Sequence, residues 1–188
     1  MSSHHIVRER QEPALLVLGM DNFSDELLGQ LLEWSPTVIV TETMAEKLNA
    51  AGIKVDWVIT DNGNDIQSDI KYLPLSDNSI INTVFEFLTA NNYPAVNVVT
   101  DELDITEYLP FFDQINLVIF YNYQKIYAIN SGFSKWKPAR ETIDLLTNTE
   151  NLQVTGLERI AETSFKTATD GIFSIQFDEP FILIAEGI

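Results

Sequence analysis

Short apolar runs alternate with amphipathic helical patterns along the first part of the chain, and this alternation constrains the fold more than any other feature. ALLVL at residues 14–18, TVIVT at 37–41 and AVNVV at 95–99 are typical of buried strands. The segment IINTVFEFLTAN at 80–91 has helical periodicity. Strands that alternate with helices favour a mainly parallel sheet with crossover helices. We therefore predict an α/β domain over residues 1–115.

The pattern changes at residues 114–116. LVIFYNYQKIYAINSG either alternates or runs apolar around Asn122, and GIFSIQF and FILIAEGI follow near the end of the chain. These runs are short and are separated by Gly, Asn, Asp or Pro, which is typical of antiparallel sheets. We predict a small antiparallel β-sandwich domain over residues 116–188, and expect YNYQKIYAI to pair with a second copy of the chain.

The charge and composition narrow the classes of partner. The chain has 28 acidic and 11 basic residues, which opposes binding to a nucleic-acid backbone. The same field opposes a nucleotide ligand unless Mg²⁺ lies between carboxylates and phosphates. No apolar run approaches the ~18–20 residues of a membrane helix, and the N-terminus lacks the apolar core of a signal peptide. We expect a cytoplasmic protein with neither nucleic acid nor membrane as a partner.

Two residue types that often carry catalysis are scarce. The chain has no cysteine, which excludes disulfides and thiol nucleophiles. Its two histidines, His4 and His5, lie in a polar N-terminal tail. This distribution argues against a Ser-His-Asp triad and against a histidine metal cluster.

The stretch KVDWVITDNGN at residues 54–64 predicts a site. An apolar strand there runs into polar residues that include the carboxylate of Asp61. Ligands of open α/β sheets bind at the carboxyl ends of the strands, so Asp61 is a candidate for chemistry. Asp-Asn-Gly-Asn is also typical of a tight turn with no further role. Both interpretations remain open on the sequence.

Two later stretches carry polar residues at corresponding places. Asn82 lies in the first turn of the helix predicted at 80–91, and TDELDIT at 100–106 follows the strand at 95–99. Together with the two-domain layout, these stretches resemble the thiamine pyrophosphokinase family over nearly the whole chain. VIT-Asp61-Asn62-Gly63-Asn64 is similar to the family's Gly-Asp-Phe/Leu-Asp-Ser motif. Asn82 stands where a Thr-Asp motif has its Asp, and TDELDIT is similar to Gly-Gly-Arg-x-Asp-His.

The resemblance implies pyrophosphoryl transfer from ATP to thiamine or a similar heterocyclic alcohol, giving thiamine diphosphate. It also implies a nucleotide-binding first domain, a thiamine-binding second domain, bound Mg²⁺ and a homodimer. Asp61 would be the principal Mg²⁺ ligand. Asp104 would lie near the thiamine hydroxyl or make a second metal contact. Both are therefore catalytic and metal-binding candidates.

Further residues are candidates for holding the cofactor or the substrate. They are Asn62, Asn64, Asn82 and Trp136. Trp136, which we place in a loop between two lysines, would either stack on a pyrimidine or cover a domain or subunit boundary. Asp77 and Asp101 are spare carboxylates close enough in sequence to substitute for a lost ligand, but their positions favour the interpretation as helix caps or exposed loop acids.

The chain departs from the family motifs in ways that affect the chemistry. Glu102 stands in the Arg position and Ile105 in the His position, while Gly63 replaces the second Asp of the first motif. An asparagine can bind a metal ion through its carbonyl but contributes no charge, and Glu102 inverts the sign that the motif supplies. A second hypothesis is therefore a family member that has lost catalysis and acts as a small-molecule binder or an interaction protein.

Overall fold

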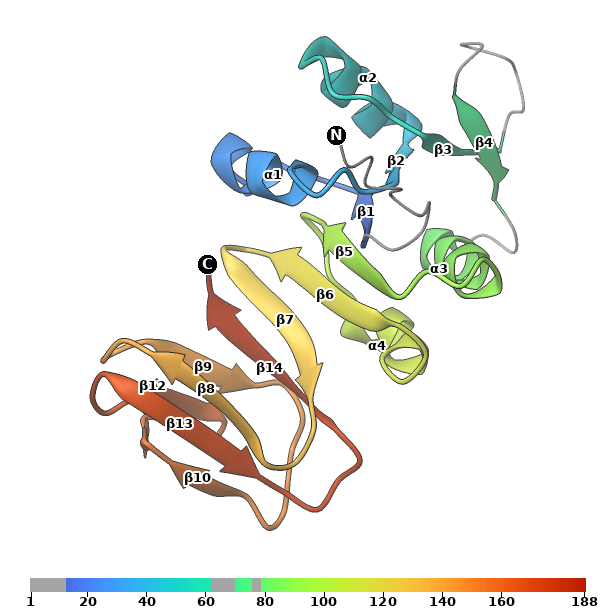
Figure 1. Ribbon diagram of the computed structural model, residues 1–188. Coiled ribbons are helices and arrows are strands. Elements are labelled where there is room, and N and C mark those ends of the chain that lie inside the picture. Colours follow the sequence, from blue (N-terminus) through green and yellow to red (C-terminus); the bar gives the residue numbers. More distant parts are fainter. Residues whose placement is uncertain (1–12, 62–69, 76–78) are drawn as a thin grey trace, which may run out of the picture. The chain divides into compact units, whose positions relative to one another are not determined.

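The computed structural model describes residues 13–61, 70–75 and 79–188 (Figure 1). Some of the residues named from the sequence lie outside the described residues, and they are His4, His5, Asn62, Gly63, Asn64 and Asp77. The chain divides into two compact units, Met1–Leu117 and Val118–Ile188.

The first unit is built on parallel strands. They are β1 (Ala14–Val17), β2 (Val38–Thr41), β3 (Trp57–Thr60), β4 (Lys71–Pro74) and β5 (Ala95–Val99). Their order in the sheet is β5-β1-β2-β3-β4, and each neighbouring pair is parallel. All four residues of β1 are buried, as its run of apolar residues predicts for a central strand. The carboxyl ends of these strands therefore meet at one edge of the sheet.

Helices follow the strands and begin at polar caps. They are α1 (Asp25–Leu32), α2 (Glu42–Ala50), α3 (Ile80–Ala90) and α4 (Ile105–Tyr108), with a 3₁₀ turn, η1, at Leu109–Phe111. Ser24, Thr41, Ser79 and Asp104 are the N-cap residues. Each accepts a hydrogen bond from a backbone amide of the first turn, which satisfies a donor that the helix leaves free. None of the helices within residues 13–61, 70–75 and 79–188 has the length and apolar character that a membrane crossing requires.

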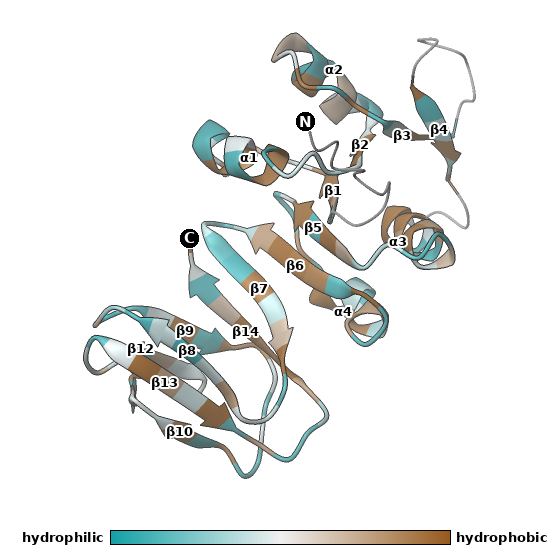
Figure 2. Ribbon diagram, viewed as in Figure 1, coloured by the Kyte–Doolittle hydropathy of each residue, from teal (hydrophilic) through white to brown (hydrophobic). Residues whose placement is uncertain are grey.

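Aromatic contacts fix α3 in the first unit. Phe85 stacks on Phe111 with ring centroids 4.7 Å apart and meets Tyr108 edge-on at 6.0 Å. Phe87, on another side of the helix, lies 4.7 Å from Trp57 of β3. Figure 2 shows the predominantly hydrophobic colouring of β1 and α3 that this packing needs.

The second unit consists of antiparallel strands, the first of which begins just before it. The strands are β6 (Asn116–Tyr121), β7 (Gln124–Ile129), β8 (Phe133–Lys137), β9 (Thr142–Leu145), β10 (Gln153–Thr155), β11 (Leu157–Arg159), β12 (Ser164–Thr167), β13 (Gly171–Gln176) and β14 (Ile182–Gly187). One set of neighbours runs β11-β12-β9-β14-β7-β6, and β10-β13-β8 form a separate sheet. Both sheets contribute to one apolar core, which includes Ile143, Phe165, Phe173, Ile175 and Ile184.

Two predictions for this segment were wrong. YNYQKIYAI does not form one strand that could pair with a second copy, because Asn122 and Tyr123 turn the chain between β6 and β7. β7 then pairs with β6 on one edge and β14 on the other, so neither edge is available. Trp136 lies in strand β8 and not in a loop, since residues 133–137 pair with β13.

Candidate functional site

Loop residues, several of them acidic, follow the parallel strands of the first unit where each strand ends. Gly19, Met20 and Asp21 follow β1, Glu42 follows β2 directly, and Asp61 follows β3. The segment 100–104 follows β5. Crevices at the carboxyl ends of parallel strands are where open α/β sheets bind ligands. This edge of the sheet is therefore the candidate functional site.

Asp101 holds two of these segments together. Its carboxylate accepts hydrogen bonds from the backbone amide of Asp21, at 3.0 Å to each oxygen, and from the amide of Asn22 at 3.2 Å. The β1–α1 loop and the β5–α4 turn are thus joined by a charge-assisted contact across 80 residues of sequence. Neighbouring Thr100 bonds through its hydroxyl to the Glu102 carbonyl oxygen, at 2.7 Å, which fixes the turn.

Two more side-chain contacts cross between neighbouring elements at this edge. Thr60, the last residue of β3, donates its hydroxyl to the carboxylate of Glu42. Lys47 of α2 forms an exposed ion pair with Asp21, with Nζ and Oδ1 3.1 Å apart. An exposed pair of this kind contributes little to stability, but it places one ammonium group beside the β1–α1 loop.

Asp61 and Asp104, the two predicted metal ligands, occupy different environments. Asp61 is exposed immediately after β3. Asp104 is exposed as well, but it caps α4 and accepts from the amide of Thr106 at 3.0 Å and from its hydroxyl at 2.6 Å. The hydroxyl and then the amide of Thr106 lower the pKa of Asp104 from its usual value. Its carboxylate is therefore engaged with its own helix.

Asn82 and Trp136, two further candidates from the sequence, lie in different units. Asn82 is exposed in the first turn of α3, where its backbone amide donates to Ser79 Oγ at 3.2 Å. Trp136 belongs to the second unit and is 60% exposed, opposite the exposed Ile172 of β13. Asp61 thus follows a strand of the first unit, Asp104 and Asn82 lie at helix starts of the same unit, and Trp136 is part of the second unit.

The donor groups in the described part of the chain do not by themselves make a metal centre. Within residues 13–61, 70–75 and 79–188, no three histidine, aspartate or glutamate side chains lie close enough together to hold one ion. Asp21, Glu42, Asp101 and Asp104 each have a protein partner instead. Mg²⁺ prefers several oxygen ligands in octahedral geometry, and these residues do not supply that set.

Sequence reasoning missed the parts played by Asp21, Glu42 and Lys47, and it treated Asp101 as a spare carboxylate. Asp21 and Glu42 could have been found by inspecting the end of every predicted strand, and not only the strands that end at Thr60 and Val99. The partners of Asp101 could not have been found in this way, because they lie about 80 residues away in the sequence.

The chain thus consists of an α/β unit with polar residues at its strand ends and a second unit of antiparallel strands. No family model and no curated protein sequence matches the chain. Solved structures do match it, and several of them are thiamine pyrophosphokinases. The enzyme of Bacillus subtilis is 11% identical, with a TM-score of 0.68 over 94% of this chain and 99% of that one.

Two further structures agree with this result. The thiamin pyrophosphokinase of Geobacillus thermodenitrificans is 9% identical, with a TM-score of 0.69 over 93% of this chain and 97% of that one. The yeast enzyme is 10% identical, with a TM-score of 0.64 over 97% of this chain and 88% of that one. The chain therefore has the thiamine pyrophosphokinase fold, as the motifs and layout of the sequence predict. At these identities the likeness concerns the fold.

Proposed function

We propose that the chain is a thiamine pyrophosphokinase-like protein that binds a small molecule at the strand-end edge of its first unit and has lost efficient pyrophosphoryl transfer. The observation that carries this proposal is the state of the carboxylates at this edge. Asp101 accepts a hydrogen bond from the backbone amide of Asp21, and Asp104 accepts one from the amide of Thr106. Glu42 accepts one from the hydroxyl of Thr60. A carboxylate bonded in this way has fewer lone pairs to offer a metal ion.

The chemistry explains why these contacts count against transfer. Moving a pyrophosphoryl group from ATP to an alcohol needs Mg²⁺ held by several oxygens and a cation near the phosphates. Glu102 has a negative charge where the family motif has an arginine, and Asn82 is uncharged where the motif has an aspartate. Binding of a neutral or cationic heterocycle requires neither bound Mg²⁺ nor a cationic side chain. The acidic residues at this edge favour a cationic ligand.

A second candidate is an active thiamine diphosphokinase that uses ATP and Mg²⁺. Asp61 supports it, because this carboxylate is exposed directly after β3, at the place that the resemblance gives to the principal Mg²⁺ ligand. Lys47 also supports it, since its ammonium lies beside the β1–α1 loop and would balance phosphate charge if it moved from Asp21. In this candidate Asp61 and Asp104 would hold Mg²⁺, and Asn62, Asn64, Asn82 and Trp136 would contact ATP or thiamine.

Calorimetric titration separates the two candidates. Thiamine and a non-hydrolysable ATP analogue are each titrated with and without Mg²⁺, and formation of thiamine diphosphate from ATP is then measured. Binding of thiamine or of the analogue without product is the expected result. Product that depends on Mg²⁺ would support the second candidate, with Asp61→Asn expected to abolish it. Absence of binding by either ligand would contradict the second candidate, and would contradict the first for thiamine and nucleotide ligands.

We also propose that the chain forms a homodimer, which rests on the resemblance alone. Sedimentation velocity at micromolar concentration tests this directly. A single species at twice the mass of 21.3 kDa is expected, and a monomer throughout the concentration range would contradict the proposal.

A further inference from the structure

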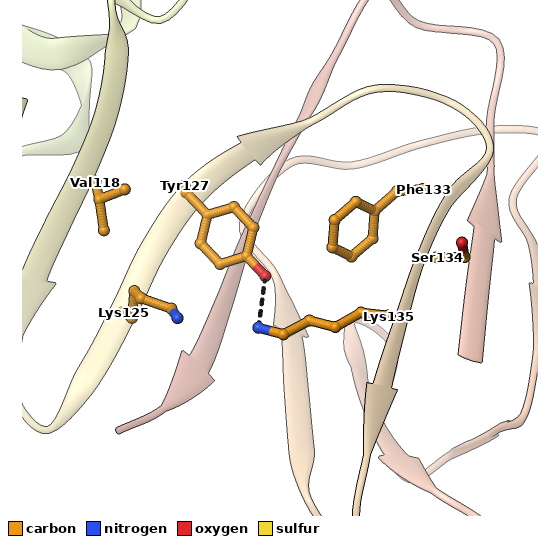
Figure 3. A pocket seen from close by; sticks show the side chains of 6 residues that line it. All are labelled: Val118, Lys125, Tyr127, Phe133, Ser134 and Lys135. Carbon is orange, nitrogen blue, oxygen red and sulfur yellow. Dashed lines mark hydrogen bonds between the residues drawn. The ribbon is translucent and has the colours of Figure 1, made fainter. Parts of the chain in front are cut away.

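A pocket lies within the second unit, between three strands that follow one another in the sequence. It has a volume of about 310 Å³ and is lined by residues of β6, β7 and β8. They are Val118, Lys125, Tyr127, Phe133, Ser134 and Lys135 (Figure 3). The volume is at the lower end of the ~300–1,000 Å³ range of small-molecule sites.

The pocket lies where the apolar core of this unit gives way to charge. Along β14, Ile182, Ile184 and Glu186 share one face, because side chains alternate along a strand. Ile182 and Ile184 belong to the core, and Glu186 is only 1% exposed. Lys125 of β7 is the residue directly opposite Glu186. A carboxylate therefore stands at the end of a hydrophobic layer.

Three lysines converge on this carboxylate. Lys125 Nζ lies 3.2 Å from Glu186 Oε1, Lys137 Nζ lies 2.8 Å from Oε2, and Lys135 contacts Oε1. Burial alone would raise the pKa of Glu186, but the lysines outweigh it and lower this pKa to about 2. Glu186 is consequently ionised at neutral pH.

The cluster has more positive charge than Glu186 neutralises. It contains three of the 11 lysine and arginine residues of the chain, although the net charge of the chain is −17. Among the described residues, the other carboxylate that forms an ion pair with it is that of Glu141, which lies 3.8 Å from Lys137 and is partly exposed. One positive charge remains after both carboxylates are counted. Because Lys137 contacts both of them, this excess falls on Lys125 and Lys135, which line the pocket and share one oxygen of Glu186.

Aromatic side chains form the wall beside these ammonium groups. Lys125 and Lys135 each have Nζ 5.6 Å from the centroid of the Tyr127 ring, and Phe133 meets that ring edge-on at 6.2 Å. The Tyr127 hydroxyl accepts from Lys135 at 3.5 Å and donates to Glu186 at 3.0 Å. Figure 3 shows the ring of Tyr127 between Lys125 and Phe133, with Lys135 directed at its hydroxyl.

We propose that this pocket binds a small organic anion, with its carboxylate or phosphate group on Lys125 and Lys135 and a flat apolar portion against Tyr127 and Phe133. Such an anion supplies the negative charge that the cluster lacks. Partly desolvated lysines bind anionic oxygens more strongly than exposed ones do. This site belongs to the second unit and is independent of the function proposed above.

Calorimetric titrations with benzoate, phenyl phosphate, inorganic phosphate and uncharged benzyl alcohol test the proposal. Benzoate or phenyl phosphate is expected to bind, and the stronger of the two identifies the anionic group. Inorganic phosphate should bind more weakly and benzyl alcohol not measurably. Binding of inorganic phosphate alone would overturn the proposal, because it would show that the pocket does not bind the ring. Binding of benzyl alcohol as strong as that of the anions would also overturn it, because it would show that the charge is not required.

Lysine variants locate the site. Lys135→Met and Lys125→Met should each weaken binding about tenfold or more, the typical effect of losing one charge-assisted hydrogen bond. Lys166→Met is the matched control, because Lys166 lies beside the core residue Phe165 on β12 and so points away from the core. It removes the same charge and should leave affinity unchanged. Circular dichroism checks that each variant is folded, and equal affinity in all folded variants would overturn the proposal.

Discussion

Gly19 and Asp101 approach so closely that no side chain fits between them. A Cβ atom built on Gly19 would lie 2.3 Å from Asp101 Oδ2 and 2.9 Å from the Asp101 backbone nitrogen. Gly19 is buried where β1 ends, and Asp101 comes two residues after β5. The absence of a side chain at Gly19 thus lets Asp101 reach the amides of Asp21 and Asn22.

Gly19→Ala should destabilise the protein by about 1–3 kcal/mol, because overpacking forces backbone or side-chain shifts of this cost. Urea unfolding measures the change. Gly29→Ala is the control, since nothing lies within 4 Å of the added atom and the residue is inside α1. It should stabilise the protein by about 0.5–1 kcal/mol through helix propensity. Equal effects of the two changes would show that the close approach is not maintained in solution.

Asp101→Asn should cost about 1–3 kcal/mol, because an amide group offers one acceptor oxygen and turns an NH₂ donor toward backbone amides. The matched change Asp104→Asn should have a much smaller effect, since asparagine is as good an N-cap as aspartate. Thermal unfolding of both variants checks this difference. If Asp104→Asn were the more destabilising change, the structural account of Asp101 would be wrong.

The elements of the first unit follow from local patterns in the sequence. ALLV, VIVT and AVNVV are apolar runs that burial in a parallel sheet explains, and Ser24 and Ser79 start helices because their hydroxyls accept amide hydrogen bonds. These features are local, so a window of a few residues contains the physics that determines them. The same reasoning placed Asp61 directly after a buried strand.

The side-chain relationships at both candidate sites depend on distant pairings instead. Strand β8, FSKWK, could face its tryptophan or its lysines inward, and only pairing with β13 decides between them. Trp136 would be the natural core residue, yet Lys135 and Lys137 point inward because Glu186 of β14 provides a buried counter-charge. No local pattern in residues 133–137 contains that carboxylate.

The turn between β6 and β7 holds two residues in the left-handed backbone region, which are Asn122 and Tyr123. Asn122 and Tyr123 have φ values of 47° and 61°, as in the tight hairpin turn that favours Asn-Gly. Tyr123 is exposed, so its ring contributes little burial. Tyr123→Gly should stabilise the protein by about 0.5 kcal/mol, the relief of left-handed strain less the flexibility of glycine. Tyr123→Ala retains the strain and should give no gain in urea unfolding; a gain equal to that of glycine would contradict this explanation.

The buried carboxylate Glu186 predicts a loss of stability in acid. Because the folded pKa of about 2 lies below the ordinary 4.5, the ionised group stabilises the fold above about pH 4.5. This contribution, up to about 3 kcal/mol, is lost as the pH falls toward 2.

Glu186→Gln should therefore flatten the decline in unfolding free energy between pH 4.5 and 2, as measured by urea unfolding at a series of pH values. At pH 7 it should cost about 3–5 kcal/mol, because three lysines lose their buried partner. Glu141→Gln removes a partly exposed carboxylate 3.8 Å from Lys137 and should change the profile little. A wild-type profile that stays flat through this acid range would show that Glu186 is not held ionised by the lysines.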